Sequence, residues 1–263
     1  MDLFTVKLIL SFVVGGVYAI VASIGADKFG TKFGGLLSGL PSTVLFGLLF
    51  IAWTQSASVA VEATTLLPAT VGIACYFLIT FVYFTRYSLW LALCLAYIVW
   101  GVITYALIAT HLTNFFVTLI IFGLSFAIAY IVLIKIFKLT SAKGRPVHYT
   151  VSLLLFRGLL SGSVIAFSVF MAKVGGPIIG GIFTTFPAVI TSVLIINHVS
   201  HGPSFTMGIA KSTIFAWIST VIFVVVARYT MVPFGIIGGI VISLVACYVS
   251  AYLLLRFVLP KHT

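Results

Sequence analysis

The chain has 263 residues, of which 62% are hydrophobic and only 6% are charged, whereas a soluble domain carries about 25% charged residues. Apolar runs near the ~20 residues that cross a bilayer occur along the whole length, which excludes a soluble protein and predicts an all-α integral membrane protein. The net charge of +11 is scattered over the segment ends, and this placement favours contact with anionic lipid head groups over binding of nucleic acid.

Breaks in the apolar pattern delimit nine candidate transmembrane helices. The first begins at Leu3 and is predicted to be a retained helix, because no basic segment precedes it and no small-residue cleavage pattern follows it. The breaks fall at residues 25–32, 54–62, 85–88, 110–114, 135–148, 172–177, 197–205 and 228–233.

The basic residues favour one orientation of these helices. If successive helices alternate in direction, one side collects Lys28, Lys32, Arg86, Lys135, Lys138, Lys143, Arg145, Arg256 and Lys261, and the other collects Lys7, Lys173 and Arg228. Because basic loops favour the cytoplasm, we expect a multi-pass protein of the cell (inner) membrane with its N-terminus outside and its C-terminus cytoplasmic.

A glycine pair followed by a proline occurs twice, at an offset of 187 − 41 = 146. The members are Gly34, Gly35 and Pro41 in the second helix and Gly180, Gly181 and Pro187 in the seventh. Residues 16–48 align with 162–194 at this offset without a gap, whereas Arg86 matches Arg228 at an offset of 142, which predicts a four-residue insertion in one half.

We interpret this pattern as a duplication. Four-helix units over residues 1–112 and 148–263 are joined by a linker helix and a basic cytoplasmic loop over 113–147. Because an odd number of crossings precedes the second unit, the two repeats are predicted to be inverted, as in many secondary transporters.

Pro41 and Pro187 lie, by helical rise, ~12 Å inside a hydrocarbon core ~30 Å thick. A proline there removes a backbone hydrogen bond and clashes with the preceding turn, so we predict two broken helices whose half-helix N-termini favour an anionic solute. The candidate substrate site comprises Ser38, Gly39, Pro41, Ser42, Thr43, Arg157, Thr184, Thr185 and Pro187. Two ordinary proline kinks lined with small residues for packing are the alternative.

Two basic residues fall inside predicted helices. Arg157 lies ~12 Å deep in the sixth helix, where a charge costs roughly 2.5–3.5 kcal/mol on insertion scales, and we expect it to face the space between the broken helices. Snorkelling to the cytoplasmic face is the alternative. Lys211, about one turn inside the eighth helix, is expected to snorkel.

The stretch "LFRGLLSGSVIAFSVFMAKVGGPIIGGIFTTFPAVITSVLIINHVSHG" and its first-half counterpart resemble the small GlpM-like bacterial membrane proteins and their uncharacterised relatives. Those are typically single four-helix units with a glycine-rich second helix centred on a proline. The resemblance implies that this chain is a fusion of two such units, and it implies an architecture more than an activity.

Glu62, His198 and His201 are candidates for ion coupling or a proton pathway. The histidines are spaced i, i+3 and could share a helical face and a metal ion, but no acid or thiol lies nearby and Glu62 is expected on the opposite side. Roles as interfacial helix-end residues, with Glu62 favoured by the helix dipole, are the alternative. We therefore predict no dedicated metal site and no cofactor.

No nucleotide-binding loop, nucleophile elbow or H-E-x-x-H motif occurs, so an enzyme is not expected. We predict an alternating-access secondary transporter for a small anionic or zwitterionic solute or a lipid-linked phosphate, with the bilayer and the solute as partners. Two alternatives stay open: a non-transporting component of an envelope-polymer or lipid pathway, and a metal or cation carrier. Homo-oligomerisation is also left open.

Overall fold

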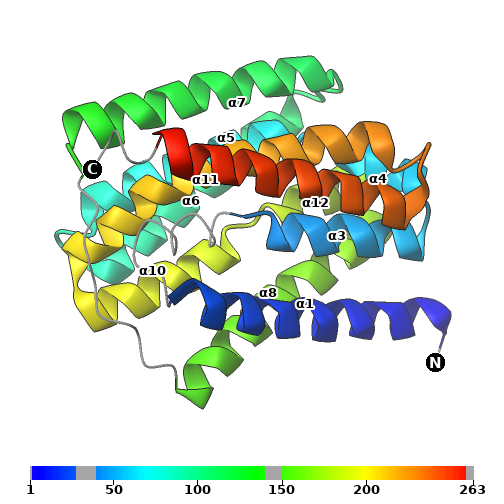
Figure 1. The fold of residues 1–263 in the computed structure, drawn as a ribbon, viewed down its shortest axis with the longest axis horizontal. Helices are drawn as coiled ribbons and strands as arrows, with labels where there is room; N and C mark the ends of the chain where they lie inside the picture. Colours follow the sequence, from blue (N-terminus) through cyan, green and yellow to red (C-terminus); the bar gives the residue numbers. More distant parts are fainter. Residues whose placement is uncertain (1, 28–39, 140–149, 259–263) are drawn as a thin grey trace.

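The computed structural model describes residues 2–27, 40–139 and 150–258, and within these residues every regular element is a helix. The first half contains α1 (Leu3–Asp27), α3 (Ser42–Thr54), α4 (Ala57–Ala63), α5 (Leu67–Phe84), α6 (Leu89–Ala109) and α7 (Phe115–Tyr130), continued by the π-helix η1 (Ile131–Ile136) (Figure 1). The second half contains α8 (Val151–Val174), α9 (Pro177–Thr184), α10 (Ala188–His201), α11 (Pro203–Thr230) and α12 (Gly235–Leu253), continued by the π-helix η2 (Leu254–Val258).

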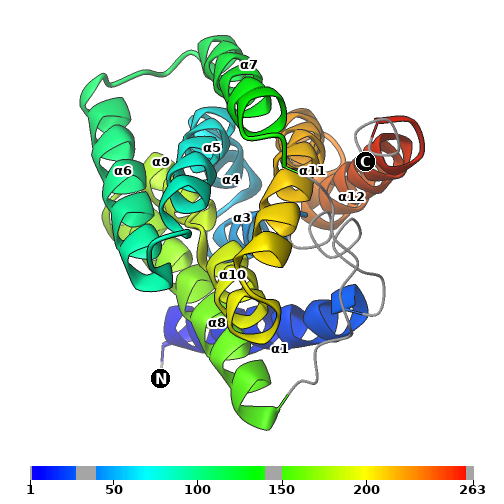
Figure 2. The same ribbon diagram turned by 90° about the vertical axis from the view of Figure 1, so that its left-hand side faces the viewer.

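The helices confirm an all-α multi-pass membrane protein. Within the described ranges, eight helical spans are long and apolar enough to cross a membrane, and the shorter apolar helix α3 adds a further segment. This agrees with about nine spans. Figure 2 shows α3 and α10 inside the bundle, with α1, α6, α7 and α12 around them. The peripheral helices expose large apolar side chains such as Tyr105 and Ile237, as expected for contact with lipid.

The two halves repeat in register at an offset of 146 residues. Helices α3 and α10 begin at residues 42 and 188, α4 and α11 at 57 and 203, and α6 and α12 at 89 and 235, and each difference is 146. Helices α5 and α11 end at residues 84 and 230, again 146 apart. The predicted four-residue insertion is therefore wrong. Arg228 lies in the last turn of α11, whereas Arg86 lies beyond the end of α5.

The repeats are inverted. In Figure 1 the helices that correspond at this offset run in opposite directions: α1 against α8, α3 against α10 and α6 against α12. The start of α1 and the end of η2 accordingly lie toward opposite ends of the bundle. The reason is the extra crossing by α7 and η1, which turns the second unit over.

The repeats meet where α1 crosses α8. A Cβ placed on Gly16 would lie 2.8 Å from the carbonyl oxygen of Gly158, and one on Gly162 would lie 2.5 Å from that of Phe12. Gly16 corresponds to Gly162 and Phe12 to Gly158, since 16 + 146 = 162 and 12 + 146 = 158. The repeat therefore relates the two contacts to each other. Small residues allow this close approach of two helix backbones, and the pseudo-two-fold axis passes through the crossing.

The glycine pair of α9 also serves close packing. A Cβ on Gly180 would overlap Ala172 of α8, and one on Gly181 would overlap the carbonyl of Ala63 in α4. The pair thereby positions α9, and with it the helix break that follows, against both repeats.

Candidate functional site

The two prolines of the repeat each begin a half-helix with the same turn. Pro41 precedes α3 with φ −75° and ψ 46°, and Pro187 precedes α10 with φ −75° and ψ 44°. In each turn the amide after the proline donates to the carbonyl before it, over 2.7 Å, from Ser42 to Leu40 and from Ala188 to Phe186. This is an inverse γ-turn. The turn at Pro187 separates α10 from α9, which confirms the predicted break there. The turn at Pro41 precedes α3 in the same form.

The N-termini of α3 and α10 open into one cavity. Their first-turn residues Thr43, Val44, Val189 and Ile190 all line it, and no side chain caps either helix within the described part of the chain. The first amides of an α-helix have no partner inside the helix and form the positive end of its dipole. Here the γ-turns use the amides of Ser42 and Ala188, which leaves the next two amides of each first turn directed at the cavity. Two such ends therefore face the same space.

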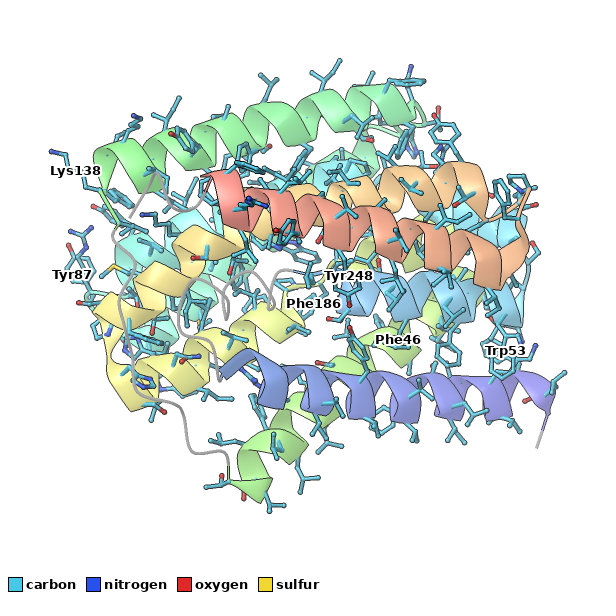
Figure 3. All side chains as sticks on the ribbon, viewed as in Figure 1. Phe46, Trp53, Tyr87, Lys138, Phe186 and Tyr248 are labelled. Atoms are coloured by element: carbon cyan, nitrogen blue, oxygen red, sulfur yellow. The ribbon has the colours of Figure 1, made fainter. Side chains whose placement is uncertain are left out.

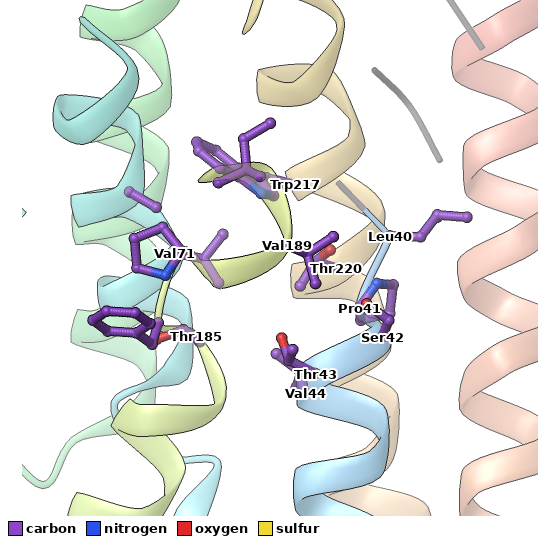
Figure 4. A pocket seen from close by; sticks show the side chains of 14 residues that line it. Leu40, Pro41, Ser42, Thr43, Val44, Val71, Thr185, Val189, Trp217 and Thr220 are labelled. Carbon is purple, nitrogen blue, oxygen red and sulfur yellow. The ribbon is translucent and has the colours of Figure 1, made fainter. Parts of the chain in front are cut away.

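The cavity has a volume of about 50 Å³, slightly less than two water molecules occupy in the liquid at ~30 Å³ each. Its lining residues are Leu40, Pro41, Ser42, Thr43, Val44, Val71, Ala74, Thr185, Phe186, Pro187, Val189, Ile190, Trp217 and Thr220 (Figure 4). Twelve of these fourteen form six pairs offset by 146: 40/186, 41/187, 43/189, 44/190, 71/217 and 74/220. The cavity thus lies on the pseudo-two-fold axis that relates the repeats.

The side chains in this symmetric cavity are not symmetric. Three pairs join a polar residue to an apolar one, namely Thr43 with Val189, Trp217 with Val71, and Thr220 with Ala74. The polar members belong to α3 and α11, and Ser42 of α3 joins them, so we call these four the polar wall. Helix α5 contributes only Val71 and Ala74. Figure 4 shows Pro41 and Ser42 beside Thr220, with Val71 and Thr185 across the cavity.

Aromatic side chains of α6 hold the break between α9 and α10. The ring of Phe186 stacks on Tyr97, with 5.4 Å between the ring centroids, and meets Trp100 edge-on at 5.3 Å. In Figure 3, Phe186 lies midway between Lys138 and Tyr87 at one end of the bundle and Trp53 at the other. The break therefore has a fixed place in the middle of the protein.

Five residues of the predicted substrate site line this cavity, namely Pro41, Ser42, Thr43, Thr185 and Pro187. Ser38 and Gly39 lie outside the described residues. Thr184 is buried against Gly47 and donates to the carbonyl of Gly181 over 2.7 Å. Arg157 is only 3% exposed on α8 but is not one of the fourteen lining residues.

The three candidate coupling residues do not come together. Glu62 is exposed on α4, whereas His198 Nδ1 lies 3.3 Å from Thr85 Oγ1 at the far end of α5. The 18 residues of α5 separate these positions by about 27 Å. The ring of His201 stacks on Phe205 at 4.4 Å. Among the described residues, no three His, Cys, Asp or Glu side chains gather in an arrangement that could hold a metal ion.

Sequence reasoning missed the contribution of α5 and α11. Trp217 and Thr220 line the cavity but are not among the predicted site residues. Lys211 is 2% exposed, so the prediction that it snorkels is wrong. A usable signal was present, because the 146 offset continues beyond residue 48 and pairs Trp217 with Val71 and Thr220 with Ala74.

A sequence model of one family, described as protein of unknown function (DUF3147), matches residues 8–113 and again residues 154–259. The two matches begin and end 146 residues apart, since 154 − 8 = 259 − 113 = 146. Together they span most of the chain, and the offset between them equals the offset between the corresponding helices. No curated protein matches, and no solved structure matches. The resemblance to GlpM-like proteins stays a prediction.

Proposed function

We propose a function from the geometry of this chain, which belongs to the DUF3147 family and carries two copies of its unit. The protein is a secondary transporter that binds a small anion in the cavity between α3 and α10. Inverted repeats with discontinuous helices at a central site are the architecture of many such transporters.

The observation that carries this proposal is the convergence of two uncapped helix N-termini on one cavity. Each N-terminus is equivalent to roughly half a positive charge, and such ends bind anions through their free amides. No carboxylate is among the fourteen lining residues. A negative charge in the cavity is thus favoured, and a cation is opposed by both helix dipoles.

The position of the cavity on the pseudo-two-fold axis supports alternating access. If the repeats exchange conformations, a solute on the axis is reached first from one side and then from the other, without leaving its site. The glycine contact between α1 and α8 lies on the same axis and provides a smooth crossing about which the repeats can rock.

Reconstitution in liposomes tests the proposal. Uptake of chloride, nitrate, acetate and phosphate is measured with the wild type, with Thr43→Val, and with the reciprocal variant Val189→Thr. A hydrogen bond to a charged group contributes about 1.5–3 kcal/mol, so loss of the Thr43 hydroxyl lowers apparent affinity about tenfold or more. Val189→Thr, which adds a hydroxyl at the paired position, retains uptake. If no anion crosses faster than in protein-free liposomes, the proposal is wrong.

The charges at the two ends support an orientation in the membrane. Lys7 donates to the carbonyl of Trp53 over 2.6 Å, and Figure 3 places Trp53 at the end of the bundle opposite Lys138. Lys7 and Lys138 thus lie at opposite ends of the bundle, which supports an external N-terminus and a cytoplasmic C-terminus as our proposal. Reporter enzymes fused to each end test this assignment, and reporting from the same side contradicts it.

A further inference from the structure

We propose that the anion is a small monocarboxylate of the size of acetate, with its carboxylate toward the polar wall and its carbon toward α5. This inference rests on the proposed function and names the substrate class of the same cavity. It follows from one buried donor, from the distribution of polar groups and from the volume.

The buried donor is the indole of Trp217. The side chain is 8% exposed and lines the cavity, and Figure 4 shows its nitrogen turned toward Thr220 and Val189. Within the described residues the indole N–H makes no hydrogen bond, and its nitrogen, unlike that of Trp100, is not among the fully buried atoms without a partner, so it is reached from the cavity. A tryptophan N–H in a buried side chain usually has a partner. The paired position in the other repeat is Val71, so the repeated fold does not itself require an aromatic donor here. A ligand that accepts a hydrogen bond explains it.

The polar groups match a planar acceptor with two oxygens. The hydroxyls of Ser42 and Thr43 and the amides of Thr43 and Val44 approach from α3, whose Ser42 amide is already bonded to Leu40, and the indole of Trp217 approaches from α11. The first turn of α10 adds further amides but no hydroxyl side chain. An ionised carboxylate only accepts hydrogen bonds and has about four lone-pair sites, which these donors can fill with short charge-assisted bonds.

The α5 side excludes ligands that are polar all round. Val71 and Ala74 present only methyl groups, so oxygens of phosphate or sulfate that face them are desolvated without a donor, which is unfavourable. A methyl group packs against the same surface without this penalty. The volume of about 50 Å³ is slightly less than that of two water molecules in the liquid, at ~30 Å³ each. It limits the ligand to a few non-hydrogen atoms, as in acetate.

The test measures uptake of radiolabelled acetate into proteoliposomes, with competition by formate, propionate, acetamide, nitrate, chloride and phosphate. We expect formate and propionate to compete, and the neutral isostere acetamide and phosphate to compete at least tenfold less well. Trp217→Phe keeps the aromatic volume but removes the donor, and it should raise the half-saturating acetate concentration about tenfold. Trp90→Phe, at an exposed position on α6, is the matched control and should leave it unchanged.

A second variant acts on the carbon end of the ligand. Val71→Ala enlarges the apolar side and should shift preference from acetate toward propionate, with charge selectivity retained. If nitrate or chloride is carried and acetate is not, or if Trp217→Phe transports acetate normally, the carboxylate assignment is wrong while the anion transporter stands. If none of these anions is carried, the proposed function itself fails.

Discussion

The phenol oxygen of Tyr97 lies 2.6 Å from Oγ1 of Thr191, and that hydroxyl donates to the carbonyl of Pro187 over 2.6 Å. A threonine hydroxyl has a single hydrogen, so Tyr97 is the donor in the first bond. The chain of bonds connects α6 to the carbonyl of Pro187 at the start of α10, which also accepts the Thr191 amide over 3.0 Å. Together with the stacking of Phe186 on Tyr97, it ties the turn at Pro187 to a helix of the other repeat.

Tyr97→Phe should therefore destabilise the protein modestly. The ring and its stacking are kept, and Thr191 retains its bond to Pro187, so the loss is one net hydrogen bond of about 1 kcal/mol. We expect the thermal unfolding temperature in detergent to fall by roughly 2–4 °C. Tyr105→Phe, at a position 75% exposed, is the control and should not change it. An equal fall for both variants contradicts a specific role of the Tyr97 hydroxyl.

The glycine contact between α1 and α8 predicts two matched effects. Gly16→Ala and Gly162→Ala each place a Cβ against a backbone carbonyl, at 2.8 and 2.5 Å, and backbone cannot move aside as a side chain can. We expect each to lower the free energy of unfolding by about 1–3 kcal/mol, measured by denaturant titration in detergent.

Gly101→Ala is the control for these substitutions, because a Cβ on Gly101 of α6 meets nothing within 4 Å. There the replacement should be neutral or stabilising, since alanine favours a helix over glycine by roughly 1 kcal/mol. If Gly16→Ala behaves like Gly101→Ala, the two helices do not cross as closely as the structure indicates.

Arg228 predicts a further contribution to stability. One guanidinium nitrogen donates to the carbonyl of Val61 over 3.0 Å and lies 2.9 and 3.3 Å from the hydroxyls of Thr64 and Thr65. The group also lies over the ring of Phe115 at 4.5 Å. The last turn of α11 thus holds the turn that separates α4 from α5, together with the start of α7.

Arg228→Lys keeps the charge but replaces the planar guanidinium, whose one nitrogen makes these bonds while its face lies over Phe115, by a single ammonium that has to serve both contacts. We expect a loss of about 1–2 kcal/mol in the free energy of unfolding. Arg256→Lys is the comparison, because Arg256 is exposed and bonds only the nearby Tyr252 among the described residues, over 3.1 Å. Equal stability of the two variants contradicts the role given to Arg228.

The features readable from the sequence were those set by local chemistry. Pro187 imposed the break between α9 and α10, and Pro41 the same turn before α3, because a proline lacks the amide donor and its ring clashes with a preceding helical turn. The glycine spacing revealed the repeat. Long-range packing was not readable in this way. The burial of Lys211 and the position of Trp217 depend on how α11 lies in the bundle, and the separation of α4 from α5 has no counterpart in the continuous α11. The match of Arg86 to Arg228 was a chance identity, since the helix ends keep the 146 register.

Arg157 supplies the last prediction. Its side chain is 3% exposed on α8, next to the Gly158 contact, and α8 packs against both α3 and α10. A buried charge acts over a longer range than an exposed one, because water does not screen it. We therefore expect Arg157 to favour an anion in the cavity through its field, although it is not a lining residue.

Arg157→Gln removes the charge and should reduce anion uptake into proteoliposomes more than tenfold, with the protein still inserted and monodisperse. Arg157→Lys keeps the charge and should retain a larger share of the uptake, because the field persists although the fork of donors is lost. Arg86→Gln, at an exposed position beyond α5, controls for the loss of one positive charge and should transport normally. If Arg157→Gln transports as well as Arg86→Gln, Arg157 has only a structural role. If Arg157→Lys and Arg157→Gln impair uptake equally, uptake depends on the hydrogen-bond geometry of Arg157 and not on its charge.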